Sequence, residues 1–368
     1  MKKMVYLLMA ALLGIILTAC GNSSGSEETG GNGESGGSEE TTADSGGGSE
    51  EAGLDLSRMR VVIGSTSTGG DTYQNAEAVS RYTEDILNTN MQVDAVGGVQ
   101  AFDALSSAPN DGRTVMFFHD MAYLGVEYGS FDQSHELENY TIGPMVATNP
   151  GNAFLTSADA PYDSMAESAE WLENNPNEEI TVAIQAGGVS EIVFNGYYLW
   201  VQEEFGQEVS DRIKAYVTGS QQDKDQALWD GNADIIHGSI GANNQYTKDG
   251  VEDQVKMKFL GITAGERVEG YDIPTMAEQG ITVDGEEFVF DKEFFFLLPK
   301  EVNENVVTAL DNAVSQVAEN EEYQSDLNNN AYTPNYMPSD EAEEYLLDKR
   351  ETMRSIIERA PDLNNIAK

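Results

Sequence analysis

Two patterns of apolar and polar positions alternate along the chain: short β-branched or aromatic runs, and longer stretches with helical spacing. In the N-terminal half the short runs predict strands, and the stretches between them predict helices. Strands that alternate with helices are typical of α/β layers, here with largely parallel strands. The expected strands are 59–63, 91–96 and 114–118, and the expected helices are 73–87 and 99–106.

The same succession restarts in the C-terminal half of the chain. Because roughly 315 residues exceed a comfortable single core, two lobes are the default expectation for the folded part. The expected strands here are 179–184, 213–217, 233–237, 259–263 and 293–298, and the expected helices are 163–174, 191–204, 220–229, 303–319 and 339–359.

The first 19 residues have the pattern of an export signal. Lys2 and Lys3 precede an apolar run over 4–17, and Leu17-Thr18-Ala19-Cys20 ends it. The run is shorter than the roughly 20 residues of a spanning helix, so it predicts a secretory signal over residues 1–19. Leu-x-Ala-Cys resembles a bacterial lipobox, in which the cysteine thiol is alkylated with diacylglycerol. We therefore expect lipidation of Cys20 and a location on the outer face of the membrane.

Residues 20–53 consist mostly of Gly, Ser, Glu and Thr. Such a composition buries too little apolar surface to offset chain entropy, which predicts a disordered tether. Cys20 is the sole cysteine, so disulfides and cysteine-rich metal sites are excluded.

Acidic side chains outnumber basic ones by 64 to 20, which gives a net charge of −44. Nucleic acid is therefore not an expected partner, because phosphate binding needs basic stripes. The simplest interpretation is a solvated surface suited to salty or alkaline surroundings, since no local pattern supports the alternative of a cation-binding face. The three histidines lack the spacing of metal ligands, so neither a metal nor another cofactor is expected.

Two turns rich in small residues each follow a predicted strand and precede a predicted helix. Such turns expose backbone N–H groups at the positive end of the helix dipole, and they bind anions without lysine or arginine. The alternative is that they are only N-caps, which is favoured for either turn alone; two turns facing across a cleft would favour binding. The candidate residues are Ser67, Thr68, Gly69, Gly70, Asp71, Thr72 and Tyr73 in the first turn, and Gly187, Gly188, Val189 and Ser190 in the second.

The order of the motifs resembles the substrate-binding proteins of tripartite tricarboxylate transporters, the Bug family. The most specific match is Arg267 followed by Ile273-Pro-Thr-Met-Ala-Glu-Gln-Gly280, similar to the family's Arg…Val-Pro-Thr-x-x-Glu-x-Gly. The resemblance runs from about residue 58 to residue 358. Its other motifs are the two turns, Asp111-Gly-Arg-Thr114, Gly219-Ser220 and Leu228-Trp-Asp-Gly231-Asn-Ala-Asp234.

This resemblance implies a two-lobed fold like that of periplasmic binding proteins, the type II Venus flytrap. Two crossover segments near residues 145–152 and 260–266 would join the lobes. Lobe 1 would then comprise 54–148 plus 264–368, and lobe 2 would comprise 149–263.

Family members hold a ligand carboxylate mostly through backbone amides and waters of the two turns. Here Ser67 replaces the family proline, Tyr73 stands where Asp is usual, and Val193 stands where His is common, so the kind of carboxylate stays open. Further candidates follow strands that end at the cleft in this fold: His119 with Asp120, and Ser239. His119 is alternatively a surface turn residue, and His237 lies inside an apolar run that predicts a core position.

The resemblance implies a solute receptor that passes a small organic acid to multispanning transporter subunits. A monomer on the surface of a single-membrane bacterium is expected. A secreted hydrolase is less favoured, because the sequence lacks a Gly-x-Ser-x-Gly elbow, a metal set and a convincing Ser/His/Asp order. A ligand-sensing receptor of the same fold is the other alternative.

Overall fold

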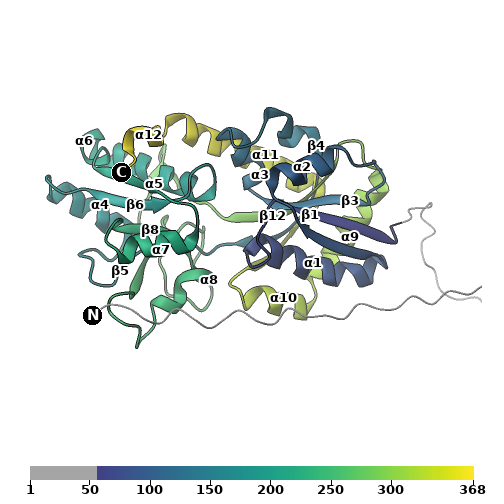
Figure 1. The fold of residues 1–368 in the computed structure, drawn as a ribbon, viewed down its shortest axis with the longest axis horizontal. Helices are drawn as coiled ribbons and strands as arrows, with labels where there is room; N and C mark the ends of the chain where they lie inside the picture. Colours follow the sequence, from purple (N-terminus) through teal and green to yellow (C-terminus); the bar gives the residue numbers. More distant parts are fainter. Residues whose placement is uncertain (1–55) are drawn as a thin grey trace, which may run out of the picture. The chain divides into compact units, whose positions relative to one another are not determined.

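The computed structural model describes residues 56–368. The predicted signal, the lipidation site Cys20 and the predicted tether lie outside this range. Within it, none of the helices has the length and apolar character needed to cross a membrane. Two mixed sheets flanked by helices organise these residues (Figure 1).

The first sheet has six strands in the order β13-β4-β12-β3-β1-β2. Strands β12 and β13 come from the C-terminal part of the chain, and β12 lies inside the sheet, so this sheet combines N-terminal and C-terminal segments. The strands are β1 (Arg58–Ile63), β2 (Asn90–Ala95), β3 (Thr114–His119), β4 (Tyr140–Asn149), β12 (Lys292–Pro299) and β13 (Thr333–Met337). The helices of this half are α1 (Asp71–Leu87), α2 (Gly98–Ser106), α3 (Met121–Glu127), α9 (Glu304–Ala318), α10 (Glu321–Asn328) and α11 (Ser339–Arg359), with 3-10 turns η1 (Gln133–His135) and η2 (Leu137–Asn139).

The second sheet has five strands in the order β7-β6-β8-β5-β9. They are β5 (Asn152–Ser157), β6 (Ile180–Ile184), β7 (Ile213–Val217), β8 (Ile235–Ser239) and β9 (Met257–Ile262). Its helices are α4 (Met165–Asn174), α5 (Val189–Phe205), α6 (Gln207–Ser210), α7 (Gln221–Trp229) and α8 (Ile240–Asn243), followed by η3 (Asn244–Tyr246). A small hairpin of β10 (Thr282–Val283) and β11 (Glu286–Glu287) and the terminal α12 (Leu363–Ile366) complete the elements.

The expectation of largely parallel strands is wrong. The β1–β2, β1–β3, β6–β7 and β6–β8 ladders are parallel, as βα units require. The β12–β3, β12–β4, β13–β4, β5–β8 and β5–β9 ladders are antiparallel. The difference arises because β4, β5, β9 and β12 belong to the connections between the two sheets rather than to βα repeats.

β4 escaped prediction because Gly143-Pro144 interrupts its apolar pattern. Pro144 cannot donate to a ladder, and it lies where the pairing with β12 shifts register between Phe295 and Leu297. A Cβ on Gly143 would come within 2.8 Å of the Leu298 side chain, so glycine permits the close approach of the two strands. Such bulges accommodate proline inside a sheet.

The division of the chain into lobes at residues 148 and 263 stays a prediction. Three segments bear on it. β4 ends at Asn149 and β5 begins at Asn152, so the chain passes between the sheets there. Thr275 forms a bridge with Ile262 of β9, and Ala367 forms one with Ala215 of β7. Parts of the region after residue 264 therefore pair with the five-stranded sheet.

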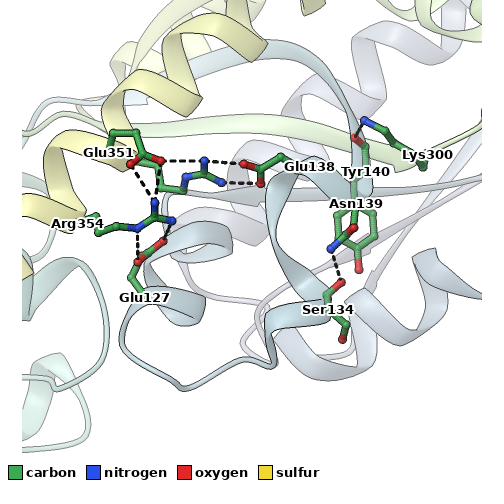
Figure 2. Close-up of polar contacts among 9 residues, drawn as sticks. Glu127, Ser134, Glu138, Asn139, Tyr140, Lys300, Glu351 and Arg354 are labelled. Atoms are coloured by element: carbon green, nitrogen blue, oxygen red, sulfur yellow. Dashed lines mark hydrogen bonds and ion pairs between the residues drawn. The ribbon is translucent and has the colours of Figure 1, made fainter.

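The long helix α11 is held by arginine–glutamate pairs (Figure 2). Arg354 bonds Glu127 of α3 at 2.6 Å, and Arg350 bonds Glu138 at 2.5 Å. Glu351 lies between the two arginines and accepts from both. Arg350 is buried and Glu138 is exposed, and the network fixes the position of α11 against α3 and η2.

Candidate functional site

A cavity of about 600 Å³ opens between the two sheets, and residues of both predicted turns line it. The wall from the six-stranded half includes Asp71, Thr72, His119 and Lys292, beside Gly97 and Gly98. The wall from the five-stranded half consists of Gln185, Ala186, Gly187, Gly188, Val189 and Ser190 with Gln221, Lys224, His237, Gly238 and Ser239.

Four helices of eight or more residues begin at this cavity: α1, α2, α5 and α7. Their first residues or N-caps, namely Asp71, Gly98, Gly188 and Gln221, all lie on its wall. The first N–H groups of a helix have no intrahelical partner, and the dipole places partial positive charge there. The backbone alone therefore makes the cavity attractive to an anion in a protein whose net charge is −44.

Glycine is required at several of these turns. Gly187 has φ +78° and Gly97 has φ +91°, both in the region that side-chain-bearing residues avoid. A Cβ on Gly188 would approach Sδ of Met121 to 2.7 Å, although Met121 belongs to the other half. The absence of a side chain at Gly188 thus lets the second turn lie close to α3.

The first turn carries its own anion. Lys292 Nζ lies 2.6 Å from Oδ2 of Asp71, and the backbone N–H of Thr72 donates to Oδ1 at 2.8 Å. Burial raises the pKa of Asp71, but the charges of Lys292 and His119 with these hydrogen bonds outweigh it and lower the pKa to about 2. The expected cradle of backbone N–H groups stays a prediction for this turn, in which the N–H of Thr72 already donates to the carboxylate of Asp71.

The second turn is more open. Ser190 Oγ accepts from the N–H of Gln185 at 3.0 Å, and Glu191 Oε2 accepts from the N–H of Gly187 at 2.6 Å. These bonds fix the loop that precedes α5. The first two N–H groups of α5, on Val189 and Ser190, have no intrahelical partner, and both residues line the cavity.

Lys224 and His237 form a buried pair on the five-stranded side. Lys224 is 4 % exposed, and its Nζ lies 3.3 Å from Nδ1 of His237. Burial lowers the pKa of Lys224 to about 8, despite the charge of Asp225. Burial and the charges of Lys224 and Lys292 hold the pKa of His237 well below its ordinary value.

His237 is buried, as its apolar run predicts, but its hydrogen bonding is incomplete. His237 lines the cavity, and its Nε2 has no hydrogen-bond partner among the residues that the structure describes. His237 lies in the middle of β8, two residues before the strand ends at Ser239, and the carboxyl ends of parallel strands border the crevice in α/β folds.

His119 lies on the opposite wall. Its Nδ1 accepts from the N–H of Met121 at 3.1 Å, so a neutral ring carries its proton on Nε2. Burial and the charge of Lys292 hold the pKa of His119 well below its ordinary value. Its neighbour Asp120 is fully buried, accepts from the N–H of Glu293 and pairs with Lys349 at 2.7 Å. Asp120 therefore supports the wall and does not line the cavity.

The remaining candidates lie nearby or elsewhere. Ser239 lines the cavity and caps α8 through a bond from the N–H of Ala242. Gly69 and Gly70 border an adjoining groove that also reaches Asp71 and Ser239. Thr68 and Tyr73 face a shallower groove beside α10, and Ser67 accepts from the N–H of Gly69 within its own turn.

Sequence reasoning missed four contributors: Lys224, Lys292, Gln221 and the turn at Gly97-Gly98. Of these four, only the glycine pair has a signal in the sequence. Val96-Gly97-Gly98-Val99 is a third small-residue turn between a predicted strand and a predicted helix.

Another cavity, of about 630 Å³, lies beside the chain segments that follow β9 and precede β13. It contains neither predicted turn. Its charged lining groups are Glu266, Arg267, Glu269 and Asp291, so carboxylates outnumber cations. An anion therefore favours the cavity with Lys224 and Lys292.

Residues 86–361 match the family described as tripartite tricarboxylate transporter family receptor, TctC. The matched range includes the second turn and both lysines. No curated protein sequence is significantly similar to the chain.

Three solved structures share the fold. A TctC solute-binding protein from Polaromonas has a TM-score of 0.64 at 15 % identity, over 82 % of this chain and 98 % of that one. MatC from Rhodopseudomonas palustris with bound malate has a TM-score of 0.62 at 17 % identity, over 82 % and 99 %. R. palustris Rpa4515 with adipate has a TM-score of 0.64 at 15 % identity, over 83 % and 99 %.

Proposed function

Because the chain belongs to the tripartite tricarboxylate transporter receptor family, we propose that it captures a small organic acid for the multispanning subunits of such a transporter. Proteins of this family are solute-binding receptors that work outside the cytoplasm, and the chain is accordingly not an enzyme. The two-lobed fold suits capture by closure of the lobes around the solute.

The observation that carries the proposal is the charge of the cavity. Four helix N-termini and two lysines line it in a strongly acidic protein, and the carboxylate of Asp71 occupies the N-terminus of α1. Asp71 neutralises Lys292, whereas Lys224 has no carboxylate oxygen within 4.0 Å among residues 56–368. A ligand carboxylate would supply the missing negative charge, and the related structures that hold malate and adipate agree with that class of ligand.

Within the cavity we assign the carboxylate contacts first to the second turn, Gly187–Ser190, whose helix has N–H groups open to the wall. On the facing wall His119 would donate from Nε2, and the hydroxyl of Thr72 lies beside it on the wall. Ser239 and the rest of the first turn, from Ser67 to Tyr73, would border the closed site.

The predicted lipid on Cys20 would hold this receptor, as a monomer, beside its membrane partner. Tethering raises the effective concentration near the transporter without a periplasm to confine the protein. Cys20→Ala should release the protein into the medium with solute binding unchanged and uptake reduced. Equal uptake by the released form would show that the anchor is not part of the mechanism.

The test is a thermal-shift screen of the ligand-stripped protein with malate, adipate, citrate, benzoate and acidic amino acids. Binding to the folded state alone raises the melting temperature by mass action, so at least one acid should produce a concentration-dependent rise. A screen without any rise would contradict the proposal.

Leucine variants locate the site. Gly188→Leu places a side chain against Met121, and Gly70→Leu adds one to the groove that adjoins the cavity, so both should abolish the shift. Gly219→Leu is the matched control, because Gly219 is exposed and a Cβ there has its nearest neighbour at 3.6 Å. Retention of the shift in both cavity variants would show that the turns are not the binding site.

A further inference from the structure

Lys224 is a buried ammonium group with too few partners. Its side chain lies on the cavity wall at the first turn of α7, and it is 4 % exposed. Of its three N–H donors, one has a partner within the described part of the chain, Nδ1 of His237. A buried charge without compensation is costly, so such a position is unfavourable unless another molecule completes it.

The nearest carboxylate does not fill this role. Asp225 follows Lys224 in α7, but its Oδ1 accepts from Asn243 at 2.8 Å and from Gln221 at 2.9 Å. It forms no ion pair with Lys224 within 4.0 Å in the described chain. Facing Lys224 from β12, Lys292 adds positive charge, which its own bond to Asp71 offsets.

On the same wall, Nε2 of His237 has no hydrogen-bond partner in the described part of the chain. The ammonium of Lys224 donates to Nδ1, so the neutral ring carries its proton on Nε2. That Nε2 is buried, lacks a partner in the protein, and belongs to a residue that is 7 % exposed and lines the cavity. A buried N–H without an acceptor is energetically unfavourable, and a bound acceptor recovers that cost.

We propose that Lys224 Nζ and His237 Nε2 form a direct binding subsite for one carboxylate group of the solute, on the five-stranded side of the cavity. This subsite rests on the proposed function and adds to the turns an ion pair made by side chains. The carboxylate would accept one hydrogen bond from the ammonium and one from the imidazole, which gives a partner to Nε2 of His237 and to a second N–H donor of Lys224. The bond from the ammonium joins two ionised groups, so it is stronger than a hydrogen bond between neutral groups.

The experiment compares Lys224→Met with the wild-type protein for every acid that binds in the screen of malate, adipate, citrate, benzoate and acidic amino acids. Methionine keeps a similar volume without the charge. The affinity, measured by titration calorimetry, should fall roughly 10- to 100-fold. The melting temperature of the ligand-free variant should rise by about 2–4 °C, because an uncompensated charge has been removed.

The rise in ligand-free stability separates a binding role from a structural one. Lys258→Met is the matched control on the same sheet, since Lys258 bonds the carbonyl of Ala160 and pairs with Asp163 at 2.6 Å. It should lower the melting temperature and leave the affinity unchanged. Lys224→Gln, which keeps a neutral donor, should weaken binding less than Lys224→Met does.

Three results would overturn the subsite. Unchanged affinity in Lys224→Met, with acids still bound by the wild-type protein, would remove the subsite and leave the proposed function intact. A fall in ligand-free stability like that of Lys258→Met, without a larger loss of affinity, would assign Lys224 a structural role. Failure of the wild-type protein to bind any of the acids would contradict the proposed function and the subsite together.

Discussion

Two lysines face the same cavity from opposite sheets, and their surroundings differ. Lys292 on β12 lies 2.6 Å from Asp71, which two further hydrogen-bonding groups hold at the start of α1. Lys224 on α7 has an imidazole nitrogen as its neighbour and no carboxylate in contact within the described residues. The charge of Lys292 is therefore neutralised within the protein, whereas the charge of Lys224 is available to a bound carboxylate.

This difference shows that the presence of a cation in a cavity does not by itself indicate a ligand contact. The ion pair of Asp71 and Lys292 removes the first helix terminus from the anion-binding set. The unpartnered N–H groups of Lys224 and His237 add side-chain donors that the backbone turns lack. Binding capacity is therefore concentrated on the five-stranded side.

The largest expected effect on stability is that of breaking the ion pair between Asp71 and Lys292. Lys292→Met leaves the carboxylate of Asp71 partly buried without its cation, and should lower the free energy of unfolding by roughly 3 kcal/mol. The double variant Asp71→Asn/Lys292→Met should recover most of the loss. Urea denaturation of the three proteins measures both values, and equal loss in the single and double variants would refute the coupling.

The second largest effect is the loss of stability when acid protonates Asp71 in the same ion pair. The pKa of Asp71 is about 2 in the folded protein against 3.8 ordinarily, so its contribution is present above pH 4 and is lost as the pH falls toward 2. A shift of this size corresponds to about 2 kcal/mol. Chemical denaturation between pH 2 and 5 should show a smaller decline in Asp71→Asn than in the wild type.

Raising the pH should remove the destabilising charge of Lys224. The pKa of Lys224 is about 8 when folded and 10.5 ordinarily, so between these values the unfolded state binds more protons and stability from this group rises with pH. The advantage of Lys224→Met over the wild type should therefore shrink by about 1–2 kcal/mol between pH 7 and 9.5. An advantage independent of pH would mean that Lys224 is not the titrating group.

The smallest effect concerns the space around the two turns. A Cβ at Gly70 has its nearest contact at 3.8 Å and φ there is −87°, so Gly70→Ala should change stability by less than about 1 kcal/mol, in the stabilising direction. Gly188→Ala must displace Met121 and should destabilise. Melting temperatures of the two variants test this, and the reverse order would contradict the close approach of the second turn to α3.

Much of the fold was predictable because local patterns encode it. The helix expected over 339–359 is α11 with the same bounds, and the strand expected over 213–217 is β7. β4 and β13 were missed because proline and polar residues interrupt their patterns, and pairing with β12 and β4 stabilises them. Tertiary pairing rather than local preference makes these segments strands.

The cavity was predictable only in part. The glycine turns have a local signature, but Lys224 lies in Gln-Gln-Asp-Lys-Asp, which is typical of an exposed helix start. Its burial depends on α7 beginning at the cavity, which no local pattern shows. Lys292 stands between two acidic residues before an aromatic run, and its partner Asp71 is 221 positions away. Contacts of such separation are properties of the folded chain.

The start of β12 also fixes how that strand aligns with its neighbours. Lys292 faces the cavity, whereas Glu293, next to it in an extended chain, accepts from Thr148 and Tyr345 on the opposite face. A slip by one residue would exchange the two charges between the faces, placing a carboxylate beside Asp71 and an ammonium among the donors that serve Glu293. Two adjacent residues of opposite charge thus exclude the misaligned strand, and the sheet is assembled in register before any solute arrives.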